Sequence, residues 1–337
     1  MTFKVTLQPS NNSFDVEEGQ SLLDAAINQG IGMPYGCRGG GCGACVSGLV
    51  SGEVEYPNGE PPALQGRAKT HCVPCMARVK SDLVLEVKEI ATTSEIQARL
   101  MPCRVQKVEH LAHDVIRLML KLPEGQRMQF MAGQYLEFIL KNGRRRAFSI
   151  ANAPHDDEFI ELHIRHVDGG VFTDWAFEQL EEKTILRIEA PLGSFVLNEE
   201  SERPMVFIGG GTGFAPIKGQ IEHALKEGVT RPIKLYWGVR SRRDLYLPEL
   251  PEQWAKEYEN VTYVPVLSEP DDDWEGRSGW VHEAVLADLE DITAYDIYMA
   301  GPPVMVKSGR DAFLEAGVSE DNMFYDSFEY AADGDKK

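Results

Sequence analysis

The stretch of residues 35–48, YGCRGGGCGACVSG, holds three cysteines and six glycines within fourteen positions. Cys37, Cys42 and Cys45 have the spacing C-x4-C-x2-C. A structural core would use Leu or Val here, and a disulfide framework would not need so many glycines. The stretch therefore indicates a metal ion, a metal cluster or a reactive thiol.

The spacing of the cysteines separates these alternatives. Plant-type 2Fe–2S clusters use C-x4-C-x2-C plus one distant cysteine, and glycines let backbone N–H groups approach the sulfurs closely. Zinc is the alternative, because Cys42/Cys45 and Cys72/Cys75 form two C-x2-C pairs. However, the gap between those pairs is longer than in a usual zinc ribbon, and Cys37 would have no role. Unligated thiols are the third alternative. The spacing favours the cluster.

The loop resembles those of plant-type ferredoxins, in which the fourth ligand lies at about the Cys75 distance and just before a strand. The segment CMARVKSDLVLEV fits that placement. Cys72 and Cys103 are then expected to be small buried residues, as free cysteines usually are. The resemblance thus implies four cluster ligands, namely Cys37, Cys42, Cys45 and Cys75.

The elements around the loop predict a compact first domain. Residues 3–8 and 13–18 alternate as a hairpin. Residues 21–30, SLLDAAINQG, predict a helix with Ser21 as its cap, and 82–90 predict a strand. We expect this domain to span residues 1–93, with a β-grasp ferredoxin fold implied by the resemblance.

A polar stretch, residues 91–100, is the predicted linker to a second domain. Strand-like runs separated by turn signals follow it and predict a small antiparallel barrel over residues 99–200. One helical segment, 173–182, interrupts them. The predicted strands are 115–122, 134–140, 146–153 and 159–167.

The pattern changes near residue 203 to strands that alternate with helices. MVFIGGG precedes FAPIKGQIEHALKEG, IKLYWGV precedes LPELPEQWAKEYE, and DIYMAGP precedes PVMVKSGRDAFLEAG. This alternation predicts a parallel, Rossmann-like sheet over residues 203–337. The chain as a whole is thus predicted to be multidomain, with all-β and α/β parts.

Two short motifs in the second domain, each weak by itself, together predict a flavin site. Arg146, Phe148 and Ser149 form an R-x-[FY]-[ST] strand, which offers a guanidinium for pyrophosphate, an aromatic face and a hydroxyl for a flavin. Each could equally be part of a plain strand end, and Thr173 could be nothing but a helix cap. A helix N-terminus against the same pyrophosphate is the second half of the predicted site, formed by Gly169, Gly170 and Thr173.

The third domain carries a glycine turn, FIGGGTGFAP, at residues 207–216. It lacks the Gly-Lys-[Ser/Thr] of a Walker loop and the last glycine of G-x-G-x-x-G. It does resemble the G-x-G-T-G-x-x-P of the ferredoxin–NADP reductase superfamily, which implies nicotinamide dinucleotide binding at the carboxyl edge of the sheet. The matching residues are Gly209, Gly211, Thr212, Gly213 and Pro216.

The same resemblance covers residues from about 100 to the end and implies further site residues. Arg240 lies in YWGVRSRRDLYL, which resembles the segment near the adenosine ribose, and AGPPVMV resembles C-G-P-P-x-M with Ala300 in place of the cysteine. We expect hydride transfer at Ser149 and Ala300. His163 and Ile164, in ELHIRHVDGGVFTDW, and Phe328, in DSFEYAADG, are implied cofactor contacts; for Phe328 a plain strand end is the alternative.

Three such sites in one chain imply an order of electron flow. Nicotinamide gives two electrons as hydride, a 2Fe–2S cluster takes one at a time, and a flavin handles both. The predicted path is NAD(P)H to FAD to 2Fe–2S to an acceptor. The domain order resembles that of oxygenase reductase components. The segments FKVTLQPS, SLLDAAINQGIGMPYGCRGGGCGAC, ELHIRHVDGGVFTDW and GTGFAPIK resemble CDP-deoxyglucoseene reductases more closely. The two resemblances imply a dehydrase or oxygenase as partner enzyme. A free-standing flavin or quinone reductase and a zinc-stabilised binding module are the alternatives.

Bulk properties set limits on partners and location. The net charge of −19 argues against nucleic acid and fits either a basic protein surface or simple solubility. No apolar run approaches the roughly 20 residues of a membrane helix. No signal peptide is seen, and six cysteines then point to reduced thiols in the cytoplasm.

Two arginines bear on the choice of nicotinamide cofactor. Arg242 and Arg243 would suit a 2′-phosphate or be plain loop charges, so NADH is expected and NADPH is the alternative.

Overall fold

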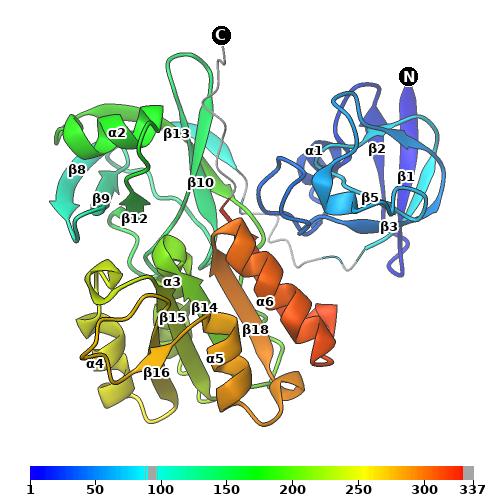
Figure 1. Ribbon diagram of the computed structural model, residues 1–337. Helices are drawn as coiled ribbons and strands as arrows, with labels where there is room; N and C mark the ends of the chain where they lie inside the picture. Colours follow the sequence, from blue (N-terminus) through cyan, green and yellow to red (C-terminus); the bar gives the residue numbers. More distant parts are fainter. Residues whose placement is uncertain (88, 90–95, 97, 329–337) are drawn as a thin grey trace. The chain divides into compact units, whose positions relative to one another are not determined.

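The computed structural model describes residues 1–87, 89, 96 and 98–328. The chain divides into two compact units, Met1–Ile96 with Gly193–Phe195, and Gln97–Leu192 with Val196–Lys337 (Figure 1). The second unit contains both the strand-rich region and the region of alternating strands and helices. The boundaries 1–93, 99–200 and 203–337 therefore stay a prediction.

The first unit is built on a mixed five-stranded sheet of order β2-β1-β7-β3-β5. Strand β1 pairs antiparallel with β2 and parallel with β7, as in a β-grasp. Strands β4 and β6 form a separate pair. The elements are β1 (Thr2–Gln8), β2 (Ser13–Glu17), α1 (Leu22–Asn28), β3 (Ser47–Ser51), β4 (Val54–Glu55), η1 (Pro62–Leu64), β5 (His71–Cys72), β6 (Arg78–Val79) and β7 (Leu83–Glu86).

Helix α1 confirms the cap that its sequence predicts. The Ser21 hydroxyl accepts a hydrogen bond from the Asp24 N–H at 3.0 Å, which satisfies one of the unpaired donors of the first turn. Leu22, Leu23 and their neighbours on the same face are fully buried against the sheet. The cysteine loop follows this helix, so the helix and sheet together fix where the loop starts.

The strand-rich region of the second unit is an antiparallel six-stranded sheet of order β11-β10-β13-β8-β9-β12. A bridge between Ile150 and Leu162 joins its two edges and closes it into the predicted barrel. Its centre is an apolar cluster. The elements are β8 (Arg99–His110), β9 (Val115–Lys121), β10 (Tyr135–Ile139), β11 (Arg145–Ser149), β12 (Ile160–Arg165), α2 (Val171–Glu178) and β13 (Ile185–Leu192).

Two barrel strands, β8 and β13, were not anticipated by the sequence. Strand β8 starts at Arg99 and so takes the last two residues of the predicted linker; most of residues 91–97 lie outside the described residues. Only Cys103 and Val105 of β8 are buried, so its apolar alternation is faint. Helix α2 begins at Val171, two residues earlier than predicted, because Gly170 and not Thr173 is its cap.

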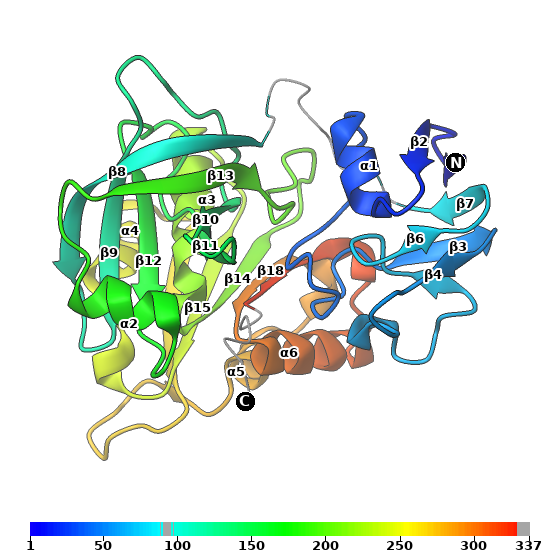
Figure 2. The same cartoon turned by 90° about the horizontal axis from the view of Figure 1, so that it is seen from above.

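The remainder of the second unit is a parallel sheet of order β17-β16-β15-β14-β18-β19. Helices α3 and α4 lie on one face, and α5 and α6 on the other (Figure 2). No helix in the described part of the chain has the length and apolar character to cross a membrane. The elements are β14 (Met205–Gly210), η2 (Gly211–Gly213), α3 (Phe214–Lys226), β15 (Ile233–Val239), η3 (Arg242–Asp244), α4 (Glu249–Glu257), β16 (Val261–Leu267), β17 (Arg277–Ser278), α5 (Val281–Asp288), η4 (Ile292–Ala294), β18 (Asp296–Gly301), α6 (Pro303–Glu315), η5 (Glu320–Asn322) and β19 (Met323–Ser327).

Candidate cluster, flavin and nicotinamide sites

The loop between α1 and β3 gathers the four predicted ligand cysteines in two pairs. The Cys37 sulfur accepts from the backbone N–H groups of Gly39 and Cys42 at 3.3 and 3.4 Å. The second pair is closed from a distant part of the chain, because Cys45 Sγ and Cys75 Sγ lie 3.4 Å apart. The tertiary structure therefore brings Cys75 to the loop.

Glycine is required in this loop by both conformation and space. Gly40 has φ +78°, and a Cβ there would lie 2.8 Å from Met76 Cγ and 3.1 Å from Pro61 Cβ. Arg38 also adopts a positive φ, +54°, and its guanidinium pairs with Asp24. The tight turn directs backbone N–H groups at the sulfurs, so the donor set and its surroundings fit a 2Fe–2S cluster.

The pKa values alone do not separate the ligand candidates from the other thiols, because in each pair the hydrogen bond between the two sulfurs lowers one pKa, that of Cys37 or Cys75, and raises the other, that of Cys42 or Cys45. A hydrogen bond from Cys42, aided by backbone N–H groups, outweighs burial and lowers the pKa of Cys37 to about 5. Burial alone raises the pKa of Cys72 and of Cys103 to about 12. Both of these thiols lie within apolar clusters. Their burial within these clusters suits Cys72 and Cys103 to packing and not to ligation.

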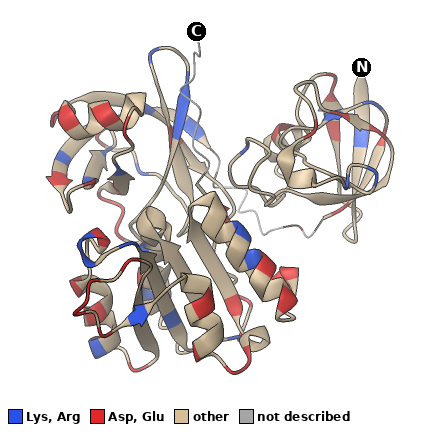
Figure 3. Cartoon of the chain, viewed as in Figure 1, with Lys and Arg blue, Asp and Glu red and all other residues tan. Residues whose placement is uncertain are grey.

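The predicted flavin strand β11 presents its residues on two faces. Phe148 packs against Phe138 and Phe172, with ring centroids 5.7 and 5.3 Å away, so its ring belongs to the barrel's aromatic cluster. Ser149 lies on the opposite face, as the alternation of a strand requires. Arg146 shares the Phe148 side and donates to the Arg145 carbonyl at 2.8 Å. The β10–β11 hairpin that carries these arginines is basic, in a chain of net charge −19 (Figure 3).

The second half of the predicted flavin site is the turn before α2. Gly169 has φ +77°, and a Cβ on Gly170 would lie 2.4 Å from the Thr173 hydroxyl. The Thr173 hydroxyl folds back to accept from the Val167 N–H at 3.2 Å and to donate to the Val167 carbonyl at 3.1 Å. Gly169 and Gly170 thus permit a turn that Thr173 holds, directly before the first turn of the helix.

One contact joins the predicted flavin region to the predicted nicotinamide region. The buried Ser149 hydroxyl donates to Asp326 Oδ2 at 3.3 Å. Asp326 lies on β19, directly beside Ala300 on β18 in the parallel register. The Ser149 hydroxyl therefore contacts the residue that pairs with Ala300, the other position expected at hydride transfer.

The glycine turn η2 follows β14 at the carboxyl edge of the sheet, next to Ala300. A Cβ on Gly213 would lie 1.9 Å from the Ala300 carbonyl oxygen, so this glycine is also required for packing. Gly211 has φ +54°, and its carbonyl accepts from the Trp237 indole at 2.9 Å. The turn and the helix start after it, where Pro216 is buried, fit the pyrophosphate of a dinucleotide.

The remaining predicted contacts occupy varied environments. The side chain of His163 is fully buried between Glu161 and Tyr246, and Ile164 lies in the barrel core. A cofactor could contact the side chain of His163 only if Glu161 or Tyr246 were displaced, and that of Ile164 only if the barrel core opened. Arg240 is exposed, with its Nε 3.5 Å from Asp244. The half-buried Phe328 donates its N–H to Gly301 at 2.9 Å, beside Ala300.

Three sequence families match consecutive parts of the chain. Residues 5–94 match the 2Fe-2S iron-sulfur cluster binding domain. Residues 102–197 match the oxidoreductase FAD-binding domain, and residues 207–311 the oxidoreductase NAD-binding domain. These matches confirm the predicted cofactors, a 2Fe–2S cluster, FAD and a nicotinamide dinucleotide, and exclude the zinc-stabilised binding module.

A full-length relative then decides the family. The CDP-6-deoxy-L-threo-D-glycero-4-hexulose-3-dehydrase reductase of Yersinia pestis is 37% identical over 328 residues, which cover 97% of this chain and 99% of that protein. The chain belongs to the iron–sulfur flavoprotein reductases of the ferredoxin–NADP reductase superfamily. This reductase is also 34% identical to terephthalate 1,2-dioxygenase reductase component 1 of Comamonas sp, over 97% of this chain and 98% of that one.

Solved structures agree with this membership. The solved structure of the ferredoxin reductase in carbazole 1,9a-dioxygenase is 28% identical to this chain, with a TM-score of 0.72. The match covers 98% of this chain and 99% of the carbazole-dioxygenase chain. The reductase is thus an NAD(P)H-dependent oxidoreductase in which electrons pass from NAD(P)H to FAD and on to the 2Fe–2S cluster. The predicted fold class and electron order are confirmed.

Several polar residues near these sites were missed at the sequence level. Asp326, Lys218, Glu161 and Tyr246 lie inside segments that were quoted only for their motifs. A signal was nevertheless present, because Lys218 and Glu161 interrupt apolar runs, in FAPIK and in FIELHI. Charged residues inside an apolar pattern need a buried partner. The sequence did not show which partner each would find.

Proposed function

We propose that this reductase oxidises NADH and delivers the electrons, one at a time, to a separate enzyme that is a deoxysugar dehydrase or an oxygenase component. The observation that carries the first half is the Ser149–Asp326 contact, with Ala300 beside Asp326. This contact supports direct hydride transfer, which requires the flavin and the nicotinamide to bind next to each other.

The separate partner is supported by the relatives. Those named above are reductases of a dehydrase or of a dioxygenase, and each is matched over nearly its whole length. A cluster domain at the end of the electron path suits a protein acceptor, whereas a free-standing flavin or quinone reductase would not need one. Free cysteines as ligands also suit a reducing compartment, and we place the protein in the cytoplasm.

The choice of NADH rests on Arg242. Its guanidinium lies 3.4 Å from the Asp273 carboxylate and 5.5 Å from the Trp274 ring centroid, so the loop of residues 269–276 already provides its partners. A 2′-phosphate would have to compete with Asp273 and would meet its negative charge. NADPH should therefore bind more weakly than NADH.

In the proposed site, each residue has one task. Cys37, Cys42, Cys45 and Cys75 would hold the cluster. Arg146 would neutralise the FAD pyrophosphate, and the first turn of α2 after Gly169 and Gly170 would donate N–H groups to it. The bound cofactors supply hydride and single-electron chemistry, and the protein orients them and excludes water. The glycine turn and Thr212 would hold the dinucleotide, and Ala300 would contact its nicotinamide.

The test is an anaerobic titration of the purified reductase with NADH and, separately, NADPH, followed by acceptor assays. We expect NADH to bleach the flavin bands and then reduce the iron–sulfur bands, at far lower concentration than NADPH. Cytochrome c, as a one-electron protein acceptor, should be reduced much faster than menadione. Faster turnover of menadione, with cytochrome c inert, would instead favour the free-standing quinone reductase.

A further inference from the structure

Strand β12 of the barrel has two faces with different tasks. Leu162 and Ile164 point into the barrel core, where both are fully buried. Glu161, His163 and Arg165, on the other face, all reach residues of the NAD-binding part. A strand places every second side chain on one face, so this row is a direct consequence of the pleat.

The row meets three different segments of the NAD-binding part. Glu161 Oε2 lies 3.1 Å from Lys218 Nζ on helix α3. His163 Nδ1 lies 3.0 Å from the Tyr246 hydroxyl, in the segment after η3. The Arg165 guanidinium lies beside the glycine turn, since a Cβ on Gly211 would be 3.0 Å from its Nη1. One face of one strand is thus in contact with a helix, a loop and a turn.

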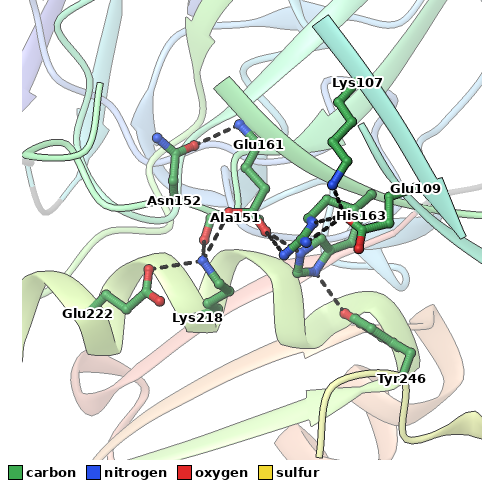
Figure 4. A network of polar contacts seen from close by, with 10 residues as sticks. Lys107, Glu109, Ala151, Asn152, Glu161, His163, Lys218, Glu222 and Tyr246 are labelled. Carbon is green, nitrogen blue, oxygen red and sulfur yellow. Dashed lines mark hydrogen bonds and ion pairs between the residues drawn. The ribbon is translucent and has the colours of Figure 1, made fainter. Parts of the chain in front are cut away.

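The Lys218 ammonium group is buried and its donors are used. It donates to Glu161, to the Ala151 carbonyl at 3.3 Å and to Glu222 at 3.0 Å (Figure 4). The side chains of Lys218 and Glu161 are each 8% exposed. Such a pair contributes little net stability, because desolvation of both charges offsets their attraction, but its geometry is strict.

The rest of the network fixes the orientation of Glu161. Its other oxygen, Oε1, lies 2.9 Å from His163 Nε2, and its backbone N–H donates to Asn152 at 2.9 Å. Burial alone raises the pKa of Glu161, but the hydrogen bond from His163 and the charge of Lys218 outweigh it and bring the pKa to about 2. Burial lowers the pKa of His163 more than Glu161 raises it, so the ring is neutral. The neutral ring donates from Nε2 to Glu161 and accepts at Nδ1 from Tyr246.

Both ends of the ion pair are rigidly linked to the proposed reaction site. On one side, α3 begins at Phe214, directly after the glycine turn, so Lys218 lies about one helical turn from it. On the other side, Leu162 bridges Ile150, the residue after Ser149. A shift of Lys218 relative to Glu161 would therefore shift the glycine turn relative to Ser149.

We propose that the buried Lys218–Glu161 pair, held by His163 and Tyr246, is a positioning device that sets the distance between the flavin-binding barrel and the dinucleotide-binding turn. These are positioning residues, not catalytic ones, because they act through β12 and α3. The proposal rests on the proposed function, in that it takes Ser149 and the glycine turn as the flavin and nicotinamide sides. The proposal adds which residues hold Ser149 and the glycine turn at a fixed distance from each other.

The test compares Lys218→Met, Glu161→Gln and the double variant with wild type. Lys218→Met leaves the carboxylates of Glu161 and Glu222 without their cation and should unfold at clearly lower temperature, whereas Glu161→Gln leaves Lys218 with Glu222 and should lose less. The double variant leaves only Glu222 without its cation and should recover part of the loss of Lys218→Met. In the double variant we still expect hydride transfer, measured by stopped-flow flavin reduction, to be about tenfold to a hundredfold slower, since misplacement by about 1 Å has such an effect. The charge-transfer absorbance band of reduced flavin with NAD⁺ should weaken, and the FAD content should not change.

Controls separate positioning from stability and from the proposed function. The exposed pair Lys307–Asp311 on α6 is the matched control, and Lys307→Gln/Asp311→Asn should keep the wild-type rate. Tyr246→Phe keeps the ring but not the hydroxyl and should slow hydride transfer severalfold. It decides the question if the double variant does not fold. The proposal is overturned if the double variant reduces its flavin at the wild-type rate and shows the wild-type absorbance band. If the double variant does not fold, the same result for Tyr246→Phe overturns the proposal. A wild-type protein whose flavin NADH does not reduce contradicts the proposed function instead.

Discussion

The hydroxyl of Ser149, on the last residue of β11, donates to the carboxylate of Asp326 on β19 at 3.3 Å, across 177 residues of sequence. The two residues come from different halves of the second unit, and both are buried. Asp326 stands beside Ala300 in the parallel sheet, so the contact connects the strand proposed for flavin to the strand proposed for nicotinamide. A hydroxyl and a carboxylate at that point can orient a cofactor and hold a proton.

Ser149→Ala should slow reduction of the flavin by NADH. The substitution removes the donor to Asp326 and leaves the backbone of β11 unchanged. We expect the rate to fall about tenfold, equivalent to about 1.4 kcal/mol in the barrier, with little change in the KM for NADH. Stopped-flow absorbance of the flavin measures the rate. Ser278→Ala, at an exposed position on β17, is the control; equal rates in all three proteins would remove Ser149 from the reaction.

Cys75→Ser should abolish the iron–sulfur absorbance and the reduction of cytochrome c, while NADH still reduces the flavin. Cys75 Sγ lies 3.4 Å from Cys45 Sγ and is proposed as the distant ligand. Cys72→Ser is the matched control, because Cys72 is fully buried in the core. That variant should keep the cluster and lose about 1–3 kcal/mol of stability through its buried hydroxyl. Iron analysis with absorbance spectra distinguishes them, and the reverse pattern would make Cys72 the ligand.

Arg146→Ala should weaken FAD binding, whereas Arg145→Ala should not. Arg145 is engaged by Glu137 at 2.8 Å and by Glu189 on the outside of the barrel. Loss of that half-exposed ion pair should cost no more than about 1 kcal/mol of stability. Loss of a charged contact to pyrophosphate should raise the Kd for FAD by roughly tenfold to a hundredfold, the equivalent of about 1.5–3 kcal/mol. Fluorescence titration of FAD into the apoprotein tests this, and identical Kd values would contradict the assignment.

Because of His163, the second unit should become less stable as the pH falls below 6.5, the ordinary pKa of histidine. Burial holds the pKa of His163 below its usual 6.5, so the unfolded chain takes up a proton there that the folded chain does not. The stability contribution is complete above pH 6.5 and is lost progressively as the pH falls. Unfolding temperatures between about pH 7.5 and pH 5.5 measure the slope.

His163→Gln is the variant that isolates this effect. Glutamine can donate to Glu161 and accept from Tyr246 but does not titrate, so its unfolding temperature should fall less over the same pH range. Glu161 does not interfere, because its stabilising charge is lost only below its ordinary value of 4.5, as the pH falls toward about 2. Parallel curves for the variant and the wild type would show that His163 is not the source of the slope.

The parts of the fold with strong local signals were predictable. The Ser21 cap, the hairpin of β1 and β2 and the strand–helix pairs around the glycine turn all depend on spacing within about ten residues. Strand β8 was missed because only Cys103 and Val105 are buried in its twelve residues. Its strand conformation comes from pairing with β9 and β13, which no local pattern encodes.

The sequence by itself determined the cofactors and their order, because cysteine spacing and glycine turns are local requirements of the groups they bind. It also identified the cysteines of the loop. The resemblance to plant-type ferredoxins implied Cys75, and the tertiary structure brings it, and not Cys72, to Cys45. Only the tertiary structure decided that Asp326 meets Ser149 and that Lys218 meets Glu161. Cys75 and Cys72 have the same side chain and lie three residues apart, so the direction in which the chain presents each one distinguishes them. Buried polar groups must find partners, but the partner is set by how the sheets pack, and that is a property of the whole chain.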